Sequence, residues 1–239
     1  MKLAVIGDPV AHSLSPALHR SFLDAAGIAG EYHALLVPAG EGAGAIAHLR
    51  TQGYRGLNVT TPLKEEAFAA CDRRDELALA SGAVNTIVFE ASETVGYNTD
   101  GIGALSAIAG ALERPDVDGL RILVLGAGPT ARASVAALIE GGASVRVWNR
   151  TAARAQMIVA TSDARLWRPG EALDIIFSTL SPLADLPDHV QSACRDVEVL
   201  VDANYGPRAT LGAALGREAI DGYGMLRAGA RASFARFTG

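Results

Sequence analysis

Cysteine is scarce in this chain of 239 residues, which has only Cys71 and Cys194. Two cysteines give neither a disulfide framework nor a metal-binding cluster of recognisable spacing. We therefore expect both to be unreactive thiols in a reducing cytoplasm, and we expect no metal site.

The chain also lacks an excess of positive charge and any long apolar run. Its formal net charge is −5, so the polyanionic surfaces of nucleic acids and anionic membranes would repel it. The first apolar run stops at Asp8 and Pro9, which makes it too short for a membrane span or a signal peptide. A small molecule is therefore the expected partner, and the protein is expected to be a monomer or a homodimer.

The composition is otherwise that of a packed protein. Hydrophobic residues make up 49% of the chain and charged residues 20%, which is ordinary globular usage. At ~100–200 residues per domain, the length allows one large domain or two small ones.

Strand-like and helix-like segments alternate along the first hundred residues. Short apolar runs bounded by turn residues predict strands, and helices are expected where a proline occupies the first position. The predicted strands are 3–6, 31–37, 56–59 and 83–90, and the predicted helices are 15–26, 40–52 and 62–70. A turn-rich stretch at 96–101 is the expected joint between two domains.

The second half has the pattern of a doubly wound parallel sheet. A helix is predicted at 102–112, and strand 121–125, helix 128–140 and strand 144–148 form one βαβ unit. Apolar runs at 173–177 and 197–201 predict further parallel strands, and the helix-like segment 224–237 is expected to cross back to the first domain.

The sequence thus predicts an α/β fold of two domains. Residues 1–100, with the C-terminal helix 225–239, form an N-terminal α/β substrate-binding and catalytic domain. Residues 101–224 form a Rossmann-type domain with a doubly wound parallel sheet that binds a dinucleotide.

A glycine-rich turn follows the strand at 121–125 and opens the next helix. It matches G-x-G-x-x-A, the pattern that brings backbone amides close to a pyrophosphate at a helix N-terminus. The predicted cofactor-binding residues of this turn are Gly126, Ala127, Gly128, Pro129 and Thr130, and the small Ala131 completes the pattern. A glycine-rich turn without a ligand is the alternative.

The residues after the second strand indicate which dinucleotide is bound. A domain that prefers NAD usually carries Asp or Glu there, but this chain has Asn149, Arg150 and Thr151, followed by Arg154. A carboxylate would repel a 2′-phosphate, whereas a guanidinium can hold it through two hydrogen bonds. These residues favour NADP, although a solvated start of a helix would also explain the arginines.

Four polar segments of the first half stand where strand-to-loop connections do not require polarity. They are Ser13-Leu14-Ser15-Pro16, the run from Asn58 to Lys64, Ala83-Val84-Asn85-Thr86, and Asn98-Thr99-Asp100. Each alone has a structural explanation, such as a helix cap or a strand end.

Together these segments resemble the shikimate dehydrogenase family. The family patterns S-x-S-P, G-x-N-V-T-x-P-x-K, G-A-V-N-T and N-T-D-G occur here in order at 13–16, 56–64, 82–86 and 98–101. The resemblance continues through 149–151, through Asp202 and Tyr205, and through Gly222-Tyr223-Gly224-Met225-Leu226, so it covers nearly the whole chain.

The resemblance implies a reversible, NADP-dependent interconversion of 3-dehydroshikimate and shikimate. It implies that Lys64 and Asp100 act at the reacting oxygen as an acid–base pair and that Gly222 lies beside the nicotinamide. The implied substrate-binding residues are Ser13, Ser15, Thr60, Asn85 and Tyr205. Hydride arriving at a carbonyl carbon builds negative charge on the oxygen, and an adjacent lysine can stabilise that charge and supply the proton.

His12, next to the serines, is a rival for acid–base work because histidine is the commonest general acid. In the family pattern, however, this histidine is a structural residue. The serines are not hydrolase nucleophiles, because no G-x-S-x-G sequence surrounds them.

Gly229 is the clearest departure from the family. The final helix of the family usually reads G-M-L-x-x-Q-A-A, and here glycine replaces the glutamine that binds the substrate. The substrate could therefore be shikimate, quinate, an aminoshikimate or a related polyhydroxylated ring acid. Two further alternatives are another two-domain NADP dehydrogenase, such as one acting on methylene-tetrahydrofolate, and a non-catalytic NADP-binding regulator.

Overall fold

The computed structural model describes residues 1–181 and 186–239, which divide into two compact units. Unit 1 consists of Met1–Thr99 and Gly229–Gly239, and unit 2 of Asp100–Ala228. The predicted division, after residue 100 and before residue 225, was displaced at both joints. Asp100 goes with unit 2 because it is the first residue of helix α5, Asp100–Ala111. The second joint falls inside one continuous helix, α10, Tyr223–Thr238.

Unit 1 is built on a mixed sheet of six strands in the order β2-β1-β3-β5-β6-β4. β1 pairs in parallel with β2 and β3, whereas β5 is antiparallel to both β3 and β6. The strands are β1 (Lys2–Gly7), β2 (Glu31–Leu36), β3 (Gly56–Val59), β4 (Arg73–Arg74), β5 (Thr86–Phe89) and β6 (Thr94–Tyr97). The helices besides α10 are α1 (Ser15–Ala25), α2 (Gly42–Thr51), α3 (Lys64–Ala70) and α4 (Glu76–Ser81).

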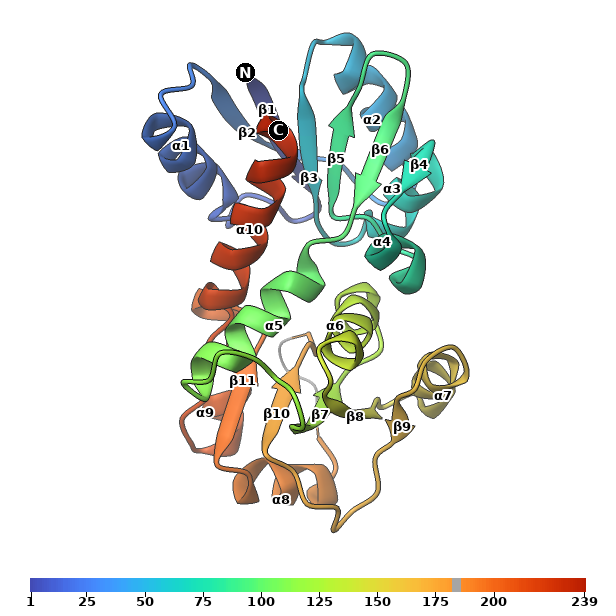
Figure 1. The fold of residues 1–239 in the computed structure, drawn as a ribbon, viewed down its shortest axis with the longest axis vertical. Helices are drawn as coiled ribbons and strands as arrows, with labels where there is room; N and C mark the ends of the chain where they lie inside the picture. Colours follow the sequence, from blue (N-terminus) through green and yellow to red (C-terminus); the bar gives the residue numbers. More distant parts are fainter. Residues whose placement is uncertain (182–185) are drawn as a thin grey trace. The chain divides into compact units, whose positions relative to one another are not determined.

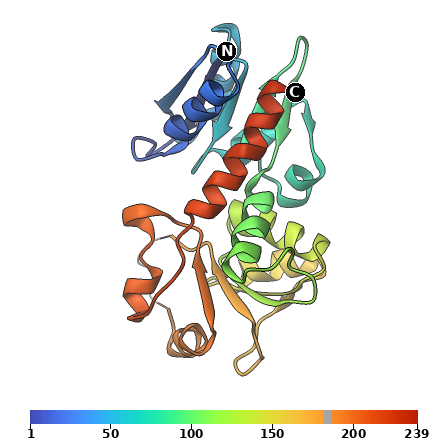
Figure 2. The same cartoon turned by 60° about the vertical axis from the view of Figure 1, so that its left-hand side comes forward.

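Both faces of this sheet are covered, because successive side chains of a strand point to opposite faces. Ala4 and Ile6 of β1 belong to a core shared with α2 and α3, and Leu3 and Val5 to a second core that includes Phe237 of α10. Figure 1 shows α1 and α10 on one side of the sheet and α2 and α3 on the other, and Figure 2 shows α1 and α10 from a second direction.

The C-terminal part of α10 is held in unit 1, as the sequence predicted for the returning helix. Phe237 is fully buried, and an added Cβ at Gly56 would come within 2.5 Å of its ring. Arg55 Nε donates to the carbonyl oxygen of Phe237 at 3.1 Å, so the last turn of the helix is tied to the start of β3.

The prediction of a turn at 96–101 was partly wrong, because residues 96 and 97 belong to β6. Gly96 pairs with Ile87 of β5, and an added Cβ there would meet Val84 and the buried Cys71. The sequence did not predict β4 or α4 either. These elements have two and six residues, too few to show a hydrophobic period of their own.

Unit 2 contains a five-stranded sheet in the order β11-β10-β7-β8-β9, with every pair parallel. Its strands are β7 (Arg121–Leu125), β8 (Ser144–Trp148), β9 (Arg165–Leu166), β10 (Ile175–Ser178) and β11 (Val199–Asp202). Its helices are α5, α6 (Pro129–Glu140), α7 (Ala152–Ala160), α8 (Asp188–Asp196), the short 3-10 helix η1 (Gly206–Arg208) and α9 (Leu211–Leu215). The predicted doubly wound parallel sheet is confirmed.

The strand order of unit 2 reverses at β7, which has β8 on one side and β10 on the other. Helices α5, α6 and α7 pack on one face of this sheet and α8 and α9 on the other. In such a fold, ligands bind beyond the carboxyl ends of the strands at the point of reversal. That point is the turn between β7 and α6.

Candidate active site

The polar segments of unit 1 meet at one end of its sheet. Ser13 and Ser15 follow the carboxyl end of β1, and Thr60 and Lys64 follow that of β3. Asn85 precedes β5, but because β5 is antiparallel to β3, its start lies at the same end. The amide of Val59 donates to the Asn85 carbonyl at 2.8 Å. The fold of unit 1 therefore places the predicted residues in one region.

The two serines begin α1 without capping it. The N-cap position is Leu14, and no side chain makes a cap hydrogen bond. Instead, the amide of Ser15 donates to Ser13 Oγ at 3.3 Å, and Ser15 is buried. A capping role for the serines was therefore the wrong alternative.

Lys64 is the first residue of α3 and is only 8% exposed. The preceding turn is closed by the Leu63 amide, which donates to the Thr60 carbonyl at 3.0 Å. The Lys64 carbonyl accepts from the amide of Val84 at 2.9 Å, so the lysine backbone is tied to the segment that leads to Asn85. A lysine side chain is rarely buried this far, which marks Lys64 as a functional candidate.

Asn85 lies in a dense hydrogen-bond cluster with its neighbours in the sheet. Its Oδ1 accepts from the Thr86 hydroxyl at 2.9 Å and from the Thr99 amide at 2.9 Å. Its Nδ2 donates to Thr99 Oγ1 at 3.1 Å, and all three residues are buried. The amide group of Asn85 is therefore fixed before any ligand arrives.

Two residues of this cluster were not assigned a role from the sequence. Asn58 Nδ2 donates to Thr86 Oγ1 at 3.2 Å, and Asn58 Oδ1 accepts from the Tyr32 hydroxyl at 2.7 Å. Asn58 lies inside the G-x-N-V-T pattern, so the signal for it was present. Tyr32 carried no signal, because it is one aromatic residue in an apolar strand.

In unit 2, the predicted cofactor turn has the conformation that its glycines allow. Gly126 has a φ of +117°, and an added Cβ there would run into Thr179, which follows β10. Gly128 is the N-cap of α6, and an added Cβ there would enter open space. The turn is thus held closely on one side and open on the other, directly at the N-terminus of a twelve-residue helix.

Asp100 stands next to this turn within unit 2. The Thr130 hydroxyl, in the first turn of α6, donates to Asp100 Oδ2 at 3.1 Å. The Thr130 side chain therefore contacts the other predicted acid–base residue. Lys64 belongs to unit 1 and Asp100 to unit 2, so their pairing stays a prediction.

The residues predicted to bind the 2′-phosphate follow the carboxyl end of β8. Asn149 Nδ2 donates to the Thr151 carbonyl at 3.0 Å and closes the turn into α7. Arg150, Thr151 and Arg154 are exposed, so their side chains are accessible to an anion.

Tyr205 and Gly222 lie beyond the carboxyl end of β11. Tyr205 is half-buried at the N-cap of η1. The amide of Gly222 donates to the Asn204 carbonyl at 2.8 Å, and an added Cβ would collide with the Ala203 carbonyl. Close backbone packing is therefore sufficient reason for glycine at 222, and its predicted place beside a nicotinamide stays a prediction.

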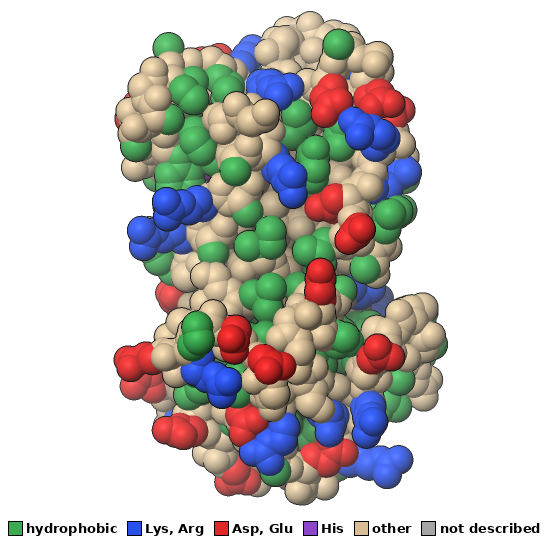
Figure 3. Space-filling view, viewed as in Figure 1, with side chains coloured by type: hydrophobic (Ala, Val, Ile, Leu, Met, Phe, Trp, Pro, Cys, Tyr) green, Lys and Arg blue, Asp and Glu red, His purple; other side chains and the backbone are tan. Residues whose placement is uncertain are grey.

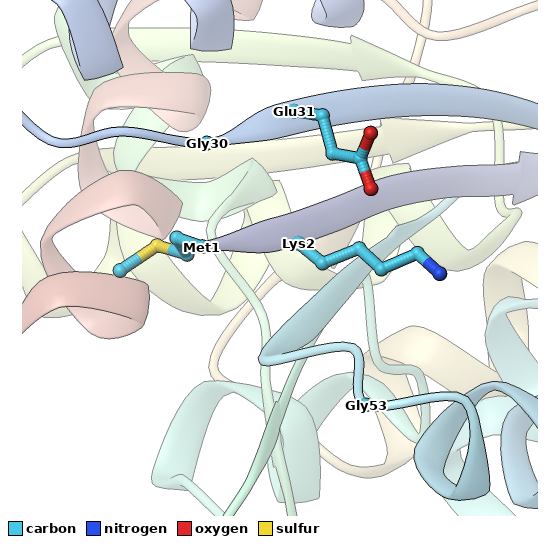
Figure 4. Close-up of a pocket in the computed structure, with 5 residues that line it drawn as sticks. All are labelled: Met1, Lys2, Gly30, Glu31 and Gly53. Carbon is cyan, nitrogen blue, oxygen red and sulfur yellow. The ribbon is translucent and has the colours of Figure 1, made fainter.

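A depression elsewhere on unit 1 lies at the opposite end of the sheet (Figure 4). It is lined by Met1, Lys2, Gly30, Glu31 and Gly53. Lys2 and Glu31 are the first residues of β1 and β2, so the depression is at the amino ends of strands whose carboxyl ends face the serines and Lys64. We therefore do not assign it to the active site.

The two cysteines are free and buried. Burial raises the pKa of the Cys71 thiol to about 12 and that of Cys194 to about 11, so both free thiols are unreactive near neutral pH. Among residues 1–181 and 186–239, no group of three or more His, Cys, Asp or Glu side chains could hold a metal ion.

Charges of both signs are interspersed on the face of the protein that Figure 3 shows. Within the described part of the chain, no helix is both long and apolar enough to cross a membrane.

Comparison with known proteins points to one family. Residues 5–87 match the family described as shikimate dehydrogenase substrate binding domain, and residues 109–182 match shikimate / quinate 5-dehydrogenase.

Individual relatives agree. The chain is 38% identical to shikimate dehydrogenase (NADP(+)) of Xanthomonas euvesicatoria, over its whole length and 90% of that relative. It is 41% identical to the enzyme of the same name from Methanococcoides burtonii, over 75% of the chain and 64% of that relative. Shikimate 5-dehydrogenase from Thermus thermophilus, solved in complex with NADP(H) and shikimate, superposes with a TM-score of 0.85 at 34% identity, covering 100% of this chain and 93% of that one. The chain therefore belongs to the shikimate dehydrogenase family.

Proposed function

We propose that this chain catalyses the reversible, NADP-dependent oxidation of shikimate to 3-dehydroshikimate. The observation that carries the proposal is Lys64, a buried lysine at the polar end of the unit 1 sheet. Relatives matched over 90% of their length are named for this reaction, and one similar structure contains both NADP(H) and shikimate. Quinate and aminoshikimate, which the sequence left open, have less support.

The residues of unit 2 fit NADP. Open space at Gly128 and the absence of a side-chain cap on α6 leave the amides of its first turn facing a site that a phosphate can approach. The exposed guanidinium groups of Arg150 and Arg154 follow the neighbouring strand, where a 2′-phosphate would be recognised. When bound, NADP+ accepts a hydride from the carbon that carries the reacting hydroxyl, and NADPH returns it.

The residues of unit 1 would bind and orient the ring acid. Ser13, Ser15 and Thr60 offer hydroxyl groups, and Asn85 offers an amide already fixed by Thr86 and Thr99. Tyr205 of unit 2 would complete the set. Such prepared polar groups lose little conformational freedom on binding, which favours affinity for a small polar ligand.

Lys64 and Asp100 would act at the reacting oxygen. During oxidation Lys64 takes the hydroxyl proton as the alcohol becomes a ketone, and during reduction it returns a proton to that oxygen. Its ammonium form stabilises the negative charge that develops on the oxygen during reduction. Asp100, held by Thr130, would orient the lysine.

We propose the cytoplasm as the compartment, supported by the two free, buried thiols that suit a reducing environment. The protein would act as a monomer or a homodimer.

The test is reduction of NADP+ by the purified protein with a panel of ring acids that includes shikimate and quinate, with NAD+ as the control cofactor. We expect the highest kcat/KM with shikimate and NADP+. Normal NADP+ binding without turnover of any ring acid would replace the enzyme with an NADP-binding regulator. Turnover of quinate alone would change the substrate but keep the reaction.

A further inference from the structure

Tyr32 lies behind the polar cluster of unit 1, and its hydroxyl is joined to that cluster. The hydroxyl donates to Asn58 Oδ1 at 2.7 Å, and Asn58 Nδ2 donates to Thr86 Oγ1 at 3.2 Å. Thr86 in turn donates to Asn85 Oδ1 at 2.9 Å. An unbroken series of hydrogen bonds therefore leads from Tyr32 to the Asn85 amide.

The same phenol is protonated. Complete burial raises the pKa of Tyr32 well above its ordinary value, and a side-chain interaction with Ser15 lowers it by a smaller amount. The phenol therefore stays protonated over the working pH range and can donate to Asn58 of β3.

The Tyr32 ring is held in place by His19. The two rings stack with centroids 4.6 Å apart and planes 12° from parallel, and both side chains are buried. The His19 ring also meets Phe22, Phe234 and Phe237. The aromatic surroundings fix the plane of the tyrosine, and so fix where its hydroxyl points.

His19 serves this role as a neutral ring. Burial lowers its pKa to about 4, and its Nδ1 has no hydrogen-bond partner among the described residues. The Ser233 hydroxyl, 3.5 Å from Nε2, donates to the Ala230 carbonyl and so can face the ring only as an acceptor. A protonated ring would bury a positive charge without a second acceptor.

We propose that Tyr32 is a positioning residue for the ring-acid substrate, through which Asn58, Thr86 and Asn85 are set in the geometry that binds it. The inference rests on the proposed function, because it takes these groups to be the substrate site. Tyr32 does not touch the reacting atoms. Its loss should weaken substrate binding in the ground state and the transition state alike, which raises KM and leaves kcat nearly unchanged.

The experiment compares Tyr32→Phe with a matched control, Tyr54→Phe. Phenylalanine keeps the ring against His19 and removes only the hydroxyl. Tyr54 is also buried, in the same unit, and its hydroxyl lies within hydrogen-bond distance, 3.0 Å, of His33 Nδ1, in a residue of β2 outside the polar cluster. Both variants keep the aromatic ring of a buried residue and lose one phenol hydroxyl that lies within hydrogen-bond distance of a partner.

Steady-state kinetics and calorimetric titration with shikimate give the readouts. For Tyr32→Phe we expect KM and Kd for shikimate to rise about three- to tenfold, the range for one neutral hydrogen bond. We expect kcat within about twofold of wild type and an unchanged KM for NADP+. Tyr54→Phe should match wild type in all three constants.

Several outcomes overturn the proposal. Unchanged shikimate constants in Tyr32→Phe, or equal changes in both variants, would leave Tyr32 a purely structural residue. If Tyr32→Phe does not fold, Asn58→Ala takes its place and must show the same separation of KM from kcat. If the wild-type protein neither binds nor turns over shikimate, both this inference and the proposed function are overturned. If the wild-type protein turns over shikimate but the shikimate constants of Tyr32→Phe are unchanged, only this inference is overturned.

Discussion

The two units bury polar side chains to different extents. Among the described residues, ten of the buried polar or charged residues belong to unit 1 and three to unit 2. In unit 1 they include the cluster around Asn85 and the buried Lys64. In unit 2 the predicted cofactor residues are backbone amides of the turn after β7, together with the exposed Arg150 and Arg154.

Under the proposed function, this difference indicates how each unit would recognise its ligand. Unit 1 would use side chains that are already hydrogen-bonded to one another, so a substitution there disturbs several partners at once. Unit 2 would use a strand-turn-helix conformation that glycine permits, together with side chains that lie outside its core. Substitutions in the polar cluster of unit 1 should therefore affect both chemistry and folding, whereas substitutions of the exposed arginines of unit 2 should mainly affect cofactor choice.

The largest expected effect is at Lys64. Lys64→Ala removes the group that we propose stabilises the developing oxyanion, so kcat should fall by at least ~10²-fold with NADP+ binding nearly unchanged. Asp100→Asn should change kcat in the same direction. The control is Lys2→Ala, which removes the chain's other lysine at the opposite end of the same sheet. Near-normal turnover of Lys64→Ala would remove this lysine from the mechanism.

The next effect should be confined to unit 2. Arg150→Ala should weaken binding of NADP+ roughly ten- to a hundredfold more than binding of NAD+, because only NADP+ carries the 2′-phosphate. Its thermal stability should not change, since Arg150 is exposed. Arg114→Ala, an exposed arginine before the amino end of β7, should discriminate between the cofactors as wild type does. Equal losses for NADP+ and NAD+ would show that Arg150 does not contact this phosphate.

Lowering the pH should reduce the free energy of unfolding through the buried His19 of unit 1. The folded-state pKa of His19, about 4, is below the ordinary value of 6.5, so the unfolded chain binds more protons between these values. Stability contributed by neutral His19 is present above pH 6.5 and is lost as pH falls toward 4. Between pH 7.5 and 5 the loss should be about 2 kcal/mol.

Urea unfolding at the two pH values measures this loss. His19→Gln should show a smaller fall in unfolding free energy than wild type, by that amount, because glutamine does not titrate. His48→Gln, which removes an exposed histidine of α2, is the control and should follow wild type. An identical fall in wild type and His19→Gln would contradict the prediction.

The smallest effect is expected at Gly229. An added Cβ at this position would lie 3.4 Å from the Thr99 carbonyl and 3.6 Å from Thr99 Oγ1, which are ordinary contacts, so a longer side chain can start beside the Asn85 cluster. Gly229→Gln should restore one neutral hydrogen bond to shikimate and lower its KM a few-fold, equivalent to ~0.5–1.5 kcal/mol.

A loss of activity in Gly229→Gln, rather than a gain, would indicate a different substrate. If the space accommodates a bulkier ring acid, the glutamine should leave shikimate oxidation low and reduce activity on that acid. Because removal of glycine from a helix also stabilises the fold by up to ~1 kcal/mol, the kinetics must be compared at temperatures where both proteins are folded.

Local patterns were sufficient for most of the architecture and for much of the site. The dense apolar strand at 121–125 and the turn of Gly126 and Gly128 predicted a Rossmann-type unit, because strand, glycine turn and helix follow one another directly. Lys64 and Asp100 were found because they lie in short motifs. Among the elements that were missed in unit 1, β4, α4 and β6 are short, and pairing with β5 or β6 rather than local preference fixes the strands among them.

The sequence by itself determined the order of the longer elements, the glycine turn and the identity of most of the polar residues, since each depends on neighbours within a few positions. Only the tertiary structure decided that Tyr32, Asn58 and Asn85 are joined by hydrogen bonds, because strand register brings together groups 26 and 27 positions apart. It also decided that Asp100 begins a helix of unit 2 and that α10 contributes to both units. The physical reason is that a hydrogen bond between distant residues depends on which strands pair and in which register, and no local pattern records that choice.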